Sequence, residues 1–289
     1  HRVLVESGAG QKSGYSDSEY QSCKAQIVSL DEGLEKAHTI VFVQGPQSIK
    51  SWKLKPEQLV IGLLNTFYQS DWLDYFCAQQ CSSLALELIP RITRAQSMDI
   101  LSSQSNLAGY KAVLLAVEQF NGVVPMLMTA AGSISPAKFL ILGAGVAGLQ
   151  AIATAKRLGG QVSAFDVRPA AKEQVESLGA RFIEVDTGED LETSSGYAKE
   201  TSDDYKQRQQ ELLNQELQKV DIVITTALIP GRQAPTLLSS EQVQMMKPGS
   251  IVVDMAVAMG GNCALSKYGE NIVHNQVTVI GHPNLASLV

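Results

Sequence analysis

Three glycines with the spacing G-x-G-x-x-G, Gly143, Gly145 and Gly148, stand between an apolar run and a helix-compatible run. Gly143 would form a tight turn, Gly145 would let the backbone approach a pyrophosphate, and Gly148 would let the helix pack closely on the strand. The amides and the positive dipole end of the helix that begins near Val146 would then carry the phosphate charge. These residue types in this order predict a dinucleotide site.

An acid follows the next predicted strand at the distance that a ribose requires. The strand 161–165 delivers Asp166, about 20 residues beyond the glycines, where a carboxylate can accept hydrogen bonds from a ribose diol and repel a 2′-phosphate. Asp166 therefore predicts NAD(H) rather than NADP(H). Arg168 is a complication, because arginine can accommodate a 2′-phosphate, but beside the acid we interpret it as packing over the adenine or its ribose.

The segment from Pro90 to Asn106 is dense in hydrogen-bonding side chains. Arg91 could donate to the oxygen of a nicotinamide carboxamide, and Asp99 could accept from its NH₂ group. The alternative is a charged, solvated loop in which these two side chains pair with each other. The residues alone leave both interpretations open.

Asp254 ends a predicted strand and is also open to two interpretations, a catalytic acid or a cap on the loop that follows. Gly260, Gly261 and Asn262 are predicted to shape a turn beside the nicotinamide pocket. Cys263, next to this turn, is predicted to be structural.

The composition excludes several classes of function. With 289 residues, 45% of them hydrophobic, the chain can bury a substantial core and is long enough for two domains. A net charge of -6 and the lack of a lysine or arginine run argue against nucleic-acid binding. No apolar segment reaches the ~20 residues that span a bilayer. The 4 cysteines and 4 histidines are too scattered to predict a disulfide framework or a metal site.

The elements that must position the candidate residues form two α/β halves. Short apolar runs separated by helix-length polar stretches predict a parallel sheet in each half. In the first half the predicted strands are 2–6, 39–43, 59–64 and 84–88. In the second half they are 138–142, 161–165, 181–185, 221–226, 250–255 and 277–281. The predicted fold class is therefore α/β, with two Rossmann-like subdomains, the second a doubly wound six-stranded parallel sheet that binds NAD.

One amphipathic helix over 103–121 is predicted to bridge the halves, with apolar residues at helical spacing: Leu107, Val113, Leu114 and Val117. We therefore expect residues 1–102 to form the first subdomain, with its start clipped inside a strand. Residues 103–282 form the NAD-binding subdomain, and residues 283–289 are expected to return to the first.

A long polar segment from Asp186 to about Gln209 separates the third and fourth strands of the second half. An ordinary connection would be only a few residues plus a helix. Two interpretations are open, a mobile loop that closes over a ligand or a surface insertion. The pair Gly196 and Tyr197 favours the loop.

Six blocks of this sequence closely resemble the NAD(H)-binding domain of proton-translocating nicotinamide nucleotide transhydrogenases. The blocks are 91–110, 143–150, 166–168, 196–200, 226–231 and 260–262. They occur in the family's order, cover essentially the whole chain, and are most similar to the bacterial type with a separate α-subunit. Alanine dehydrogenases are similar in architecture.

The resemblance implies a specific set of nucleotide contacts and no metal. Each part of the nucleotide has its own group of residues. The nicotinamide loop contains Arg91, Ile92, Thr93, Gln96, Asp99 and Ser102, the pyrophosphate turn Gly143, Gly145, Val146 and Gly148, the adenosine side Asp166, Val167 and Arg168, the mobile loop region Gly196, Tyr197 and Gln209, and the nicotinamide ribose Leu228. Of these, Gln96 is implied to reach toward the NADP(H) of a partner.

The resemblance also implies an activity and an assembly. Hydride passage between two nicotinamides needs no general base, so Arg91, Gln96 and Asp99 would act by positioning, with the two C4 atoms held at ~3–3.5 Å and water excluded. The family domain is a homodimer that docks on an NADP(H)-binding domain attached to membrane subunits. We therefore expect a peripheral protein without a span of its own, at the cytoplasmic face of the bacterial inner membrane.

Two other functions compete with this expectation. An alanine-dehydrogenase-like amino acid oxidoreductase would need a proton acceptor, and alanine dehydrogenases carry a lysine and a histidine in the substrate domain. We align those positions with Gln44 and Asn65, neither of which can shuttle a proton at neutral pH. A non-catalytic NADH-binding module would bind the nucleotide without any hydride transfer.

Overall fold

A computed structural model of the chain describes residues 2–45, 48–66, 70–184, 203–229 and 231–289. The chain forms two compact units, residues 1–100 and 101–289. The subdomain boundary at 102/103 stays a prediction. For residues 283–289, which were expected to return to the first unit, the structure shows Leu285 buried in the core of the second.

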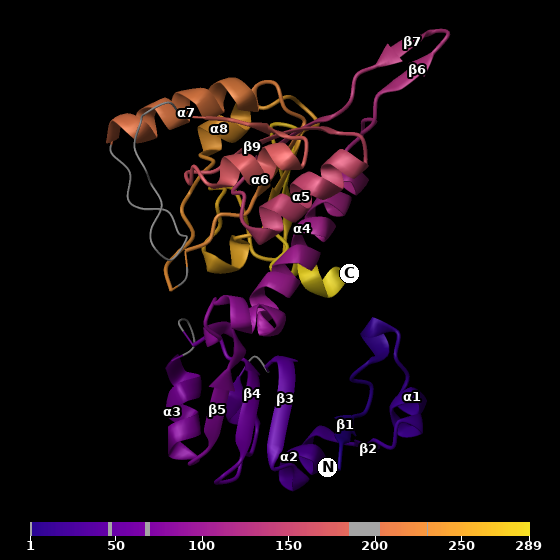
Figure 1. The fold of residues 1–289 in the computed structure, drawn as a ribbon, viewed down its shortest axis with the longest axis vertical. Helices are drawn as coiled ribbons and strands as arrows, with labels where there is room; N and C mark the ends of the chain where they lie inside the picture. The colour runs from indigo at the N-terminus through magenta and orange to yellow at the C-terminus, as the bar shows by residue number, and fades with distance from the viewer. Residues whose placement is uncertain (1, 46–47, 67–69, 185–202, 230) are drawn as a thin grey trace. The chain divides into compact units, whose positions relative to one another are not determined.

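Among its described residues, the first unit contains two small parallel sheets instead of one continuous sheet (Figure 1). β1 pairs with β2, and a second sheet has the order β3-β4-β5. The strands are β1 (Leu4–Glu6), β2 (Gln26–Val28), β3 (Thr39–Gln44), β4 (Leu59–Leu63) and β5 (Ser82–Ala85). The predicted strand over 84–88 is wrong beyond Ala85, because the chain leaves the sheet there and turns into the 3-10 helix η3 (Leu86–Leu88).

Helices and short turns connect these strands. They are α1 (Asp17–Ser22), α2 (Leu30–Lys36), α3 (Ser70–Ala78), η1 (Gln11–Ser13), η2 (Ile49–Ser51) and η4 (Thr93–Met98). Phe42 of β3 meets Trp52 and Trp72 edge to face, with ring centroids 5.3 and 6.3 Å away. This aromatic group belongs to the core of the first unit, together with Val60 and Phe76.

Within the described part of the second unit, one seven-stranded sheet has the order β10-β9-β8-β11-β12-β14-β13. The strands are β8 (Lys138–Leu142), β9 (Gln161–Phe165), β10 (Arg181–Phe182), β11 (Ile222–Thr225), β12 (Ile251–Asp254), β13 (Asn271–His274) and β14 (Val277–Ile280). The predicted α/β class and the doubly wound parallel order are confirmed. The predicted number of six is corrected by β13, an antiparallel edge strand joined to β14 through Asn275 and Gln276, which both have positive φ.

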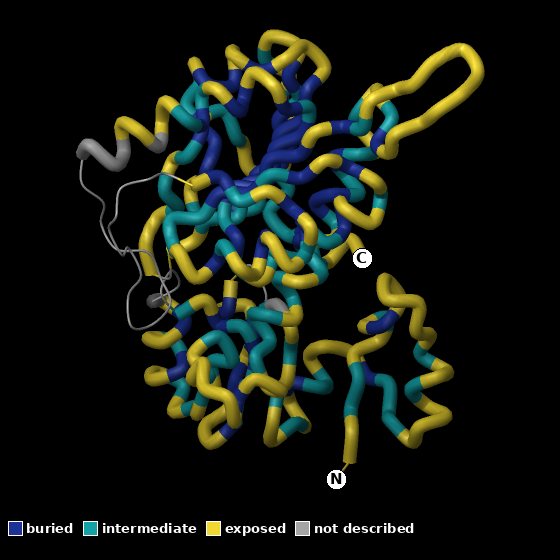
Figure 2. Tube along the Cα trace, turned by 45° about the horizontal axis from the view of Figure 1, so that its top comes forward, coloured by how far each residue is buried: buried dark blue, intermediate teal, exposed yellow. Residues whose placement is uncertain are grey.

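Helices cover both faces of this sheet, which is why its strands are apolar along their whole length. They are α4 (Ile100–Gln119), α5 (Val146–Arg157), α6 (Ala171–Ser177), α7 (Asp203–Leu217) and α8 (Ser240–Gln244), with η5 (Val257–Met259) and η6 (Leu285–Leu288) near the carboxyl edge. Phe139 and Ile141 of β8 pack in one core with α4, α5 and α6, whereas Leu140 and Leu142 pack in the other with α7 and α8. Figure 2 shows these strands buried between more exposed helices.

The helix α4 begins and ends slightly before the predicted 103–121. Its buried residues are small, Gly109, Ala112, Val113 and Ala116, so the predicted apolar stripe is only partly correct. A Cβ on Gly109 would lie 2.1 Å from the carbonyl oxygen of Ala147, so the backbone of α4 touches the start of α5 directly. Within the described ranges, no helix has the length and apolarity to cross a bilayer.

A hairpin of β6 (Leu127–Thr129) and β7 (Gly132–Ile134) projects from the second unit (Figures 1 and 2). All residues of both strands are exposed, although three of their side chains and the preceding one are large and apolar: Met126, Leu127, Met128 and Ile134. The sequence pattern did not predict this hairpin.

Candidate functional site

The chain turns sharply between β8 and α5. Gly143 has φ +102°, and a Cβ at this position would lie 2.5 Å from Thr226 Oγ1. Its amide donates to Phe165 O at the end of β9 (2.8 Å), while Thr226 Oγ1, just after β11, donates to Gly143 O (3.0 Å). The strands on both sides of β8 therefore hold the turn, and glycine is required at its first position.

Gly145 and Gly148 differ in what surrounds them. A Cβ on Gly148 would lie 1.8 Å from Gly143 O, so α5 packs directly on the turn. Apart from its chain neighbours, a Cβ on Gly145 would meet no described atom within 4 Å, and its φ of -74° suits any residue. The fold itself therefore does not require glycine at 145, but a ligand that approaches the backbone would.

Asp166 connects the second strand to this turn. Its Oδ2 accepts from the Ala144 amide (2.7 Å) and from Arg168 Nη2 (3.0 Å), and its Oδ1 accepts from the Arg168 amide (2.9 Å) and Nε (3.0 Å). The side chain of Asp166 is only 8% exposed, and that of Arg168 is 25% exposed. The carboxylate is thus fixed beside the glycine turn, with the guanidinium directly against it.

The start of α5 has the chemistry of an anion site. In the described part of the chain no side chain caps this helix, whose N-cap is Gly145. The first amides of a helix need partners and carry the positive end of the helix dipole. The turn, these amides and Asp166 together fit a dinucleotide, with donors for a pyrophosphate and an acceptor for a ribose diol.

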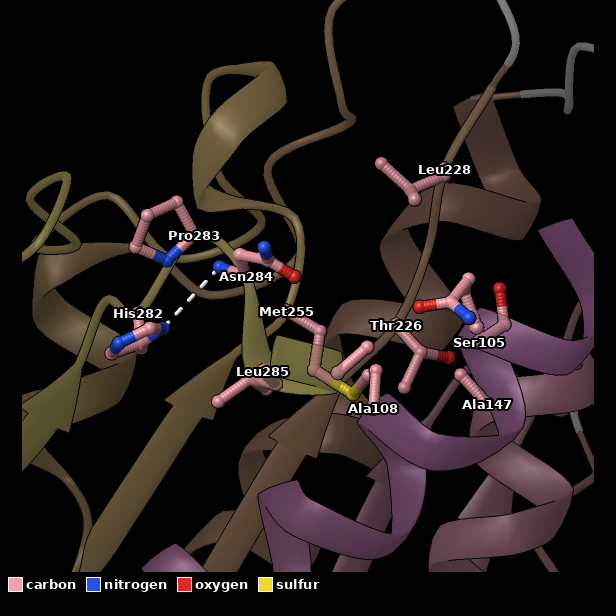
Figure 3. Close-up of a pocket in the computed structure, with 12 residues that line it drawn as sticks. Ser105, Ala108, Ala147, Thr226, Leu228, Met255, His282, Pro283, Asn284 and Leu285 are labelled. Atoms are coloured by element: carbon pink, nitrogen blue, oxygen red, sulfur yellow. Dashed lines mark hydrogen bonds between the residues drawn. The ribbon is translucent and has the colours of Figure 1, made fainter. Parts of the chain in front are cut away.

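A pocket of about 180 Å³ opens beside the turn, at the carboxyl ends of β11, β12 and β14 (Figure 3). Its lining combines apolar and polar side chains: Gln104, Ser105, Ala108, Ala147, Thr226, Leu228, Met255, His282, Pro283, Asn284, Leu285 and Ala286. In Figure 3, Ser105, Ala147 and Thr226 lie on one side, and His282 and Asn284 lie on the other. A largely apolar pocket with a few polar groups can take a flat heteroaromatic ring with an amide substituent.

Asp254 acts as a loop cap, the structural one of its two interpretations. It is fully buried at the end of β12, and its carboxylate accepts from three backbone amides, those of Ala256, Asn262 and Cys263. Burial raises the pKa of the Cys263 thiol, which leaves it protonated and unreactive at neutral pH. Both residues therefore support the loop instead of reacting.

The structure brings together the predicted residues of the second unit, namely the three glycines, Val146, Asp166, Val167, Arg168 and, in the adjacent pocket, Leu228. The predicted nicotinamide loop belongs to the first unit. There Arg91 and Ile92 precede η4, Thr93 and Gln96 lie in it, and Asp99 follows it, with Ser102 in α4. Their roles stay predictions.

Gly196 and Tyr197 lie outside the described residues. The predicted polar segment also included Gln209, and here the expectation of a loop is wrong. Residues 203–209 belong to α7, whose later residues Leu213 and Leu217 are buried against the sheet. The apolar spacing of this helix was obscured by its polar first half.

Several pocket residues were not predicted as sites: Gln104, Ser105, Thr226, Met255, His282 and Asn284. The available signal was position, since Thr226, Met255 and His282 each follow closely on a parallel strand. Ligands of doubly wound sheets bind outside these carboxyl ends. Which side chains from different strands share one pocket, however, depends on the strand order.

The two positions aligned with proton-transfer residues also lie at one sheet edge. Gln44 ends β3 in register with Leu63 of β4, and Asn65 follows β4 with φ +50°. The geometry thus places an amide residue at both positions where a parallel sheet presents its chemistry.

Comparison with known families assigns both halves of the chain. Residues 1–108 match the family described as "Alanine dehydrogenase/PNT, N-terminal domain", and residues 112–289 match "Alanine dehydrogenase/PNT, C-terminal domain". The two matches together cover nearly all of the chain.

Individual relatives agree with this assignment. The chain is 46% identical to the first of the polypeptides that form the NAD(P) transhydrogenase alpha subunit of Rhodospirillum rubrum, over 99% of this chain and 77% of the relative. It is 26% identical to alanine dehydrogenase of Mycolicibacterium smegmatis, over 90% and 66%. A crystal structure of transhydrogenase from Sinorhizobium meliloti is similar with a TM-score of 0.88 and 44% identity, covering 99% of this chain and 78% of that one.

Proposed function

The chain belongs to the alanine dehydrogenase/PNT family, and from this we propose that it is the NAD(H)-binding component of a proton-translocating NAD(P) transhydrogenase. The observation that carries the proposal is the glycine turn with open space at Gly145 and the acid at Asp166. It occurs in a chain that is 46% identical to a polypeptide of a transhydrogenase alpha subunit.

The residues of the second unit would bind and orient the nucleotide. The amides at the start of α5 would hold the pyrophosphate, and Asp166 would accept from the adenosine ribose. Bound NADH supplies the hydride. Arg91, Gln96 and Asp99 would position the nicotinamide ring, and the pocket beside Thr226 and Leu228 would keep water from it.

The acceptor would be a second nucleotide, because the chain offers amides where an amino acid dehydrogenase needs proton carriers. Dehydrogenation of an amino acid releases a proton in addition to the hydride, whereas transfer between two nicotinamides does not require a base. Gln44 and Asn65 fit the second case. The acceptor NADP(H) would be held by a partner domain.

The same proposal includes the assembly. The chain would form a homodimer and dock on an NADP(H)-binding domain and its membrane subunits, at the cytoplasmic face of the bacterial inner membrane. Proton translocation would take place in those subunits. The exposed apolar hairpin of β6 and β7 supports a contact between copies, because a surface of this kind is unusual on a monomer.

Mixing the protein with a separately prepared NADP(H)-binding transhydrogenase domain, NADH and the thionicotinamide analogue of NADP⁺ tests the proposal. We expect reduced analogue only when both proteins are present. In the variant Gln96→Ala the transfer rate should fall while NADH still binds, because Gln96 is proposed to act between the nucleotides. Ser97→Ala, the adjacent exposed residue of η4, is the matched control and should leave the rate unchanged.

Two results would contradict the proposal. Absence of reduced analogue, with NADH binding demonstrated, would indicate a binding module without hydride transfer. Reduction of NAD⁺ by L-alanine without a second protein would indicate an amino acid dehydrogenase.

A further inference from the structure

Asn262 lies at a junction of three segments and is fully buried. Its side-chain Oδ1 accepts from the Ala227 amide (3.0 Å), and its Nδ2 donates to Ala227 O (2.9 Å) and Pro235 O (2.8 Å). Its own carbonyl accepts from the amides of Leu237 and Leu238. One amide side chain thus ties the segment after β11 to the segment after β12.

Asp254 fixes Asn262 from below. The Oδ2 atom of Asp254 accepts from the Asn262 amide (2.8 Å), the Cys263 amide (3.0 Å) and Ser266 Oγ (2.5 Å). Gly261 has φ +84°, and a Cβ there would lie 2.9 Å from the same carboxylate oxygen. The glycine therefore allows the loop to close tightly over Asp254, and this closure orients Asn262.

The segment held by Asn262 forms a wall of the pocket. Thr226 and Leu228 line the pocket on either side of Ala227. Thr226 is bound to the glycine turn through Gly143 O, and Ala227 is bound to Asn262 at both its amide and its carbonyl. The wall is therefore anchored at one end by the pyrophosphate turn and at the other by Asn262.

We propose that Asn262 is a positioning residue for the nicotinamide half of the site, acting through Ala227 to hold Thr226 and Leu228 against the ring, with Asp254 orienting Asn262. This inference rests on the proposed binding of NAD(H). Only a side-chain amide can accept from one backbone amide and donate to two carbonyls at once. The adenosine half, built on Asp166, has its own supports and does not depend on this junction.

The test compares NADH with 5′-AMP, which occupies only the adenosine half. In Asn262→Ala we expect the Kd for NADH to rise about tenfold or more, from the loss of buried hydrogen bonds. The Kd for 5′-AMP should stay near the wild-type value. Both constants can be measured by titration calorimetry, with the fluorescence of bound NADH as a second report on the nicotinamide environment.

Gln242→Ala is the matched control. Gln242 is also a buried amide of the second unit, accepting from the Ser239 amide (2.9 Å) and donating to Asn214 Oδ1 (2.8 Å), but it does not line the pocket. It should lower the Tm in the same way as Asn262→Ala and leave the ratio of the two Kd values unchanged.

Asn262→Asp keeps the shape and keeps the test decisive if the alanine variant fails to fold. A carboxylate at 262 would face Ala227 O and Pro235 O without a proton to donate, and burial raises the pKa of such a group. As the pH falls and the carboxyl becomes protonated, it can again donate to one carbonyl. NADH affinity of this variant should therefore rise between pH 8 and pH 6, relative to wild type, while 5′-AMP affinity follows wild type.

Equal weakening of NADH and 5′-AMP would overturn the inference, because Asn262 would then only stabilise the fold. Unchanged NADH affinity in both variants would overturn it as well. A wild-type chain that binds neither ligand would instead overturn the proposed function on which the inference rests.

Discussion

At the scale of single residues, the nucleotide site is defined by where a side chain would and would not fit. Gly143 and Gly148 are enclosed by neighbouring atoms, and Gly145 faces open space. Asp166 is held by the turn and by Arg168, so its carboxylate is oriented before any ligand arrives. Such preorganisation lowers the ordering cost of binding.

Gly145→Ala should separate folding from binding. The new Cβ meets no described atom within 4 Å, so we expect a Tm close to that of wild type. NADH binding should be lost or weakened at least tenfold, because the methyl group would occupy the space that the pyrophosphate needs. Gly148→Ala, whose Cβ would lie 1.8 Å from Gly143 O, should lower the Tm strongly. Full NADH affinity in Gly145→Ala would place the nucleotide elsewhere.

Asp166→Asn should weaken NADH binding about 10- to 100-fold, since hydrogen bonds to a charged group are lost. It should also reduce the preference for NADH over NADPH, because the repulsion of a 2′-phosphate disappears. Fluorescence titration with both nucleotides measures this preference.

The control for this variant is Asp221→Asn. Asp221 accepts from the Lys138 amide (2.8 Å) and from Lys247 Nζ (2.7 Å) at the opposite end of β8. It should leave the preference for NADH unchanged. An unaltered preference in Asp166→Asn would mean that this acid does not select between the two nucleotides.

At the scale of elements, small residues decide how the helices meet. The buried face of α4 is formed by Gly109, Ala112, Val113 and Ala116, and Gly109 touches the carbonyl of Ala147 in the first turn of α5. The helix that carries Gln104 and Ser105 to the pocket is therefore placed by direct backbone contact with the proposed pyrophosphate helix.

Gly109→Ala should destabilise the second unit by about 1–3 kcal/mol, as expected when a methyl group is forced into a packed contact. NADH affinity should also fall, because α4 and α5 are pushed apart beside the site. Gly33→Ala is the matched control, a helical glycine of α2 whose Cβ would make an ordinary 3.5 Å contact with Val28. It should be neutral or stabilising by about 0.5–1 kcal/mol. Calorimetric unfolding of both variants measures the difference, and equal stability would mean that the two helices are not in close contact at Gly109.

At the scale of the whole molecule, the two units carry different parts of the proposed chemistry. The glycine turn, Asp166 and the pocket belong to the second unit, and Arg91, Gln96 and Asp99 belong to the first. The family assignment covers both. The hairpin of β6 and β7 is the feature most clearly directed at another chain, since Met128 is 78% exposed and a two-stranded hairpin is marginally stable alone.

Met128→Glu should therefore shift the protein from dimer to monomer at micromolar concentration, because a charge would be buried in an apolar contact. Light scattering coupled to size-exclusion chromatography measures the mass. Met245→Glu, an exposed methionine at the end of α8, should leave the mass unchanged. A Met128→Glu protein that remains dimeric would place the contact between copies on another surface.

Much of the fold and the adenosine half of the site could be predicted because their signals are local. Apolar runs indicated β8, β9, β11, β12 and β14, and the spacing of three glycines with one acid indicated the turn. β13 escaped prediction because it is a short edge strand with two polar ends, exposed on alternate residues. The start of α7 escaped because its first half is polar.

The sequence by itself determined the parallel sheet, the glycine turn and the preference for NAD(H), since steric and hydrogen-bond requirements of a few adjacent residues are sufficient for each. Only the tertiary structure decided that Asp254 is a loop cap, that Asn262 holds Ala227, and that His282 and Thr226 share a pocket. These residues come from different strands, and their contacts exist only because the strand order places β11 beside β12 and β12 beside β14.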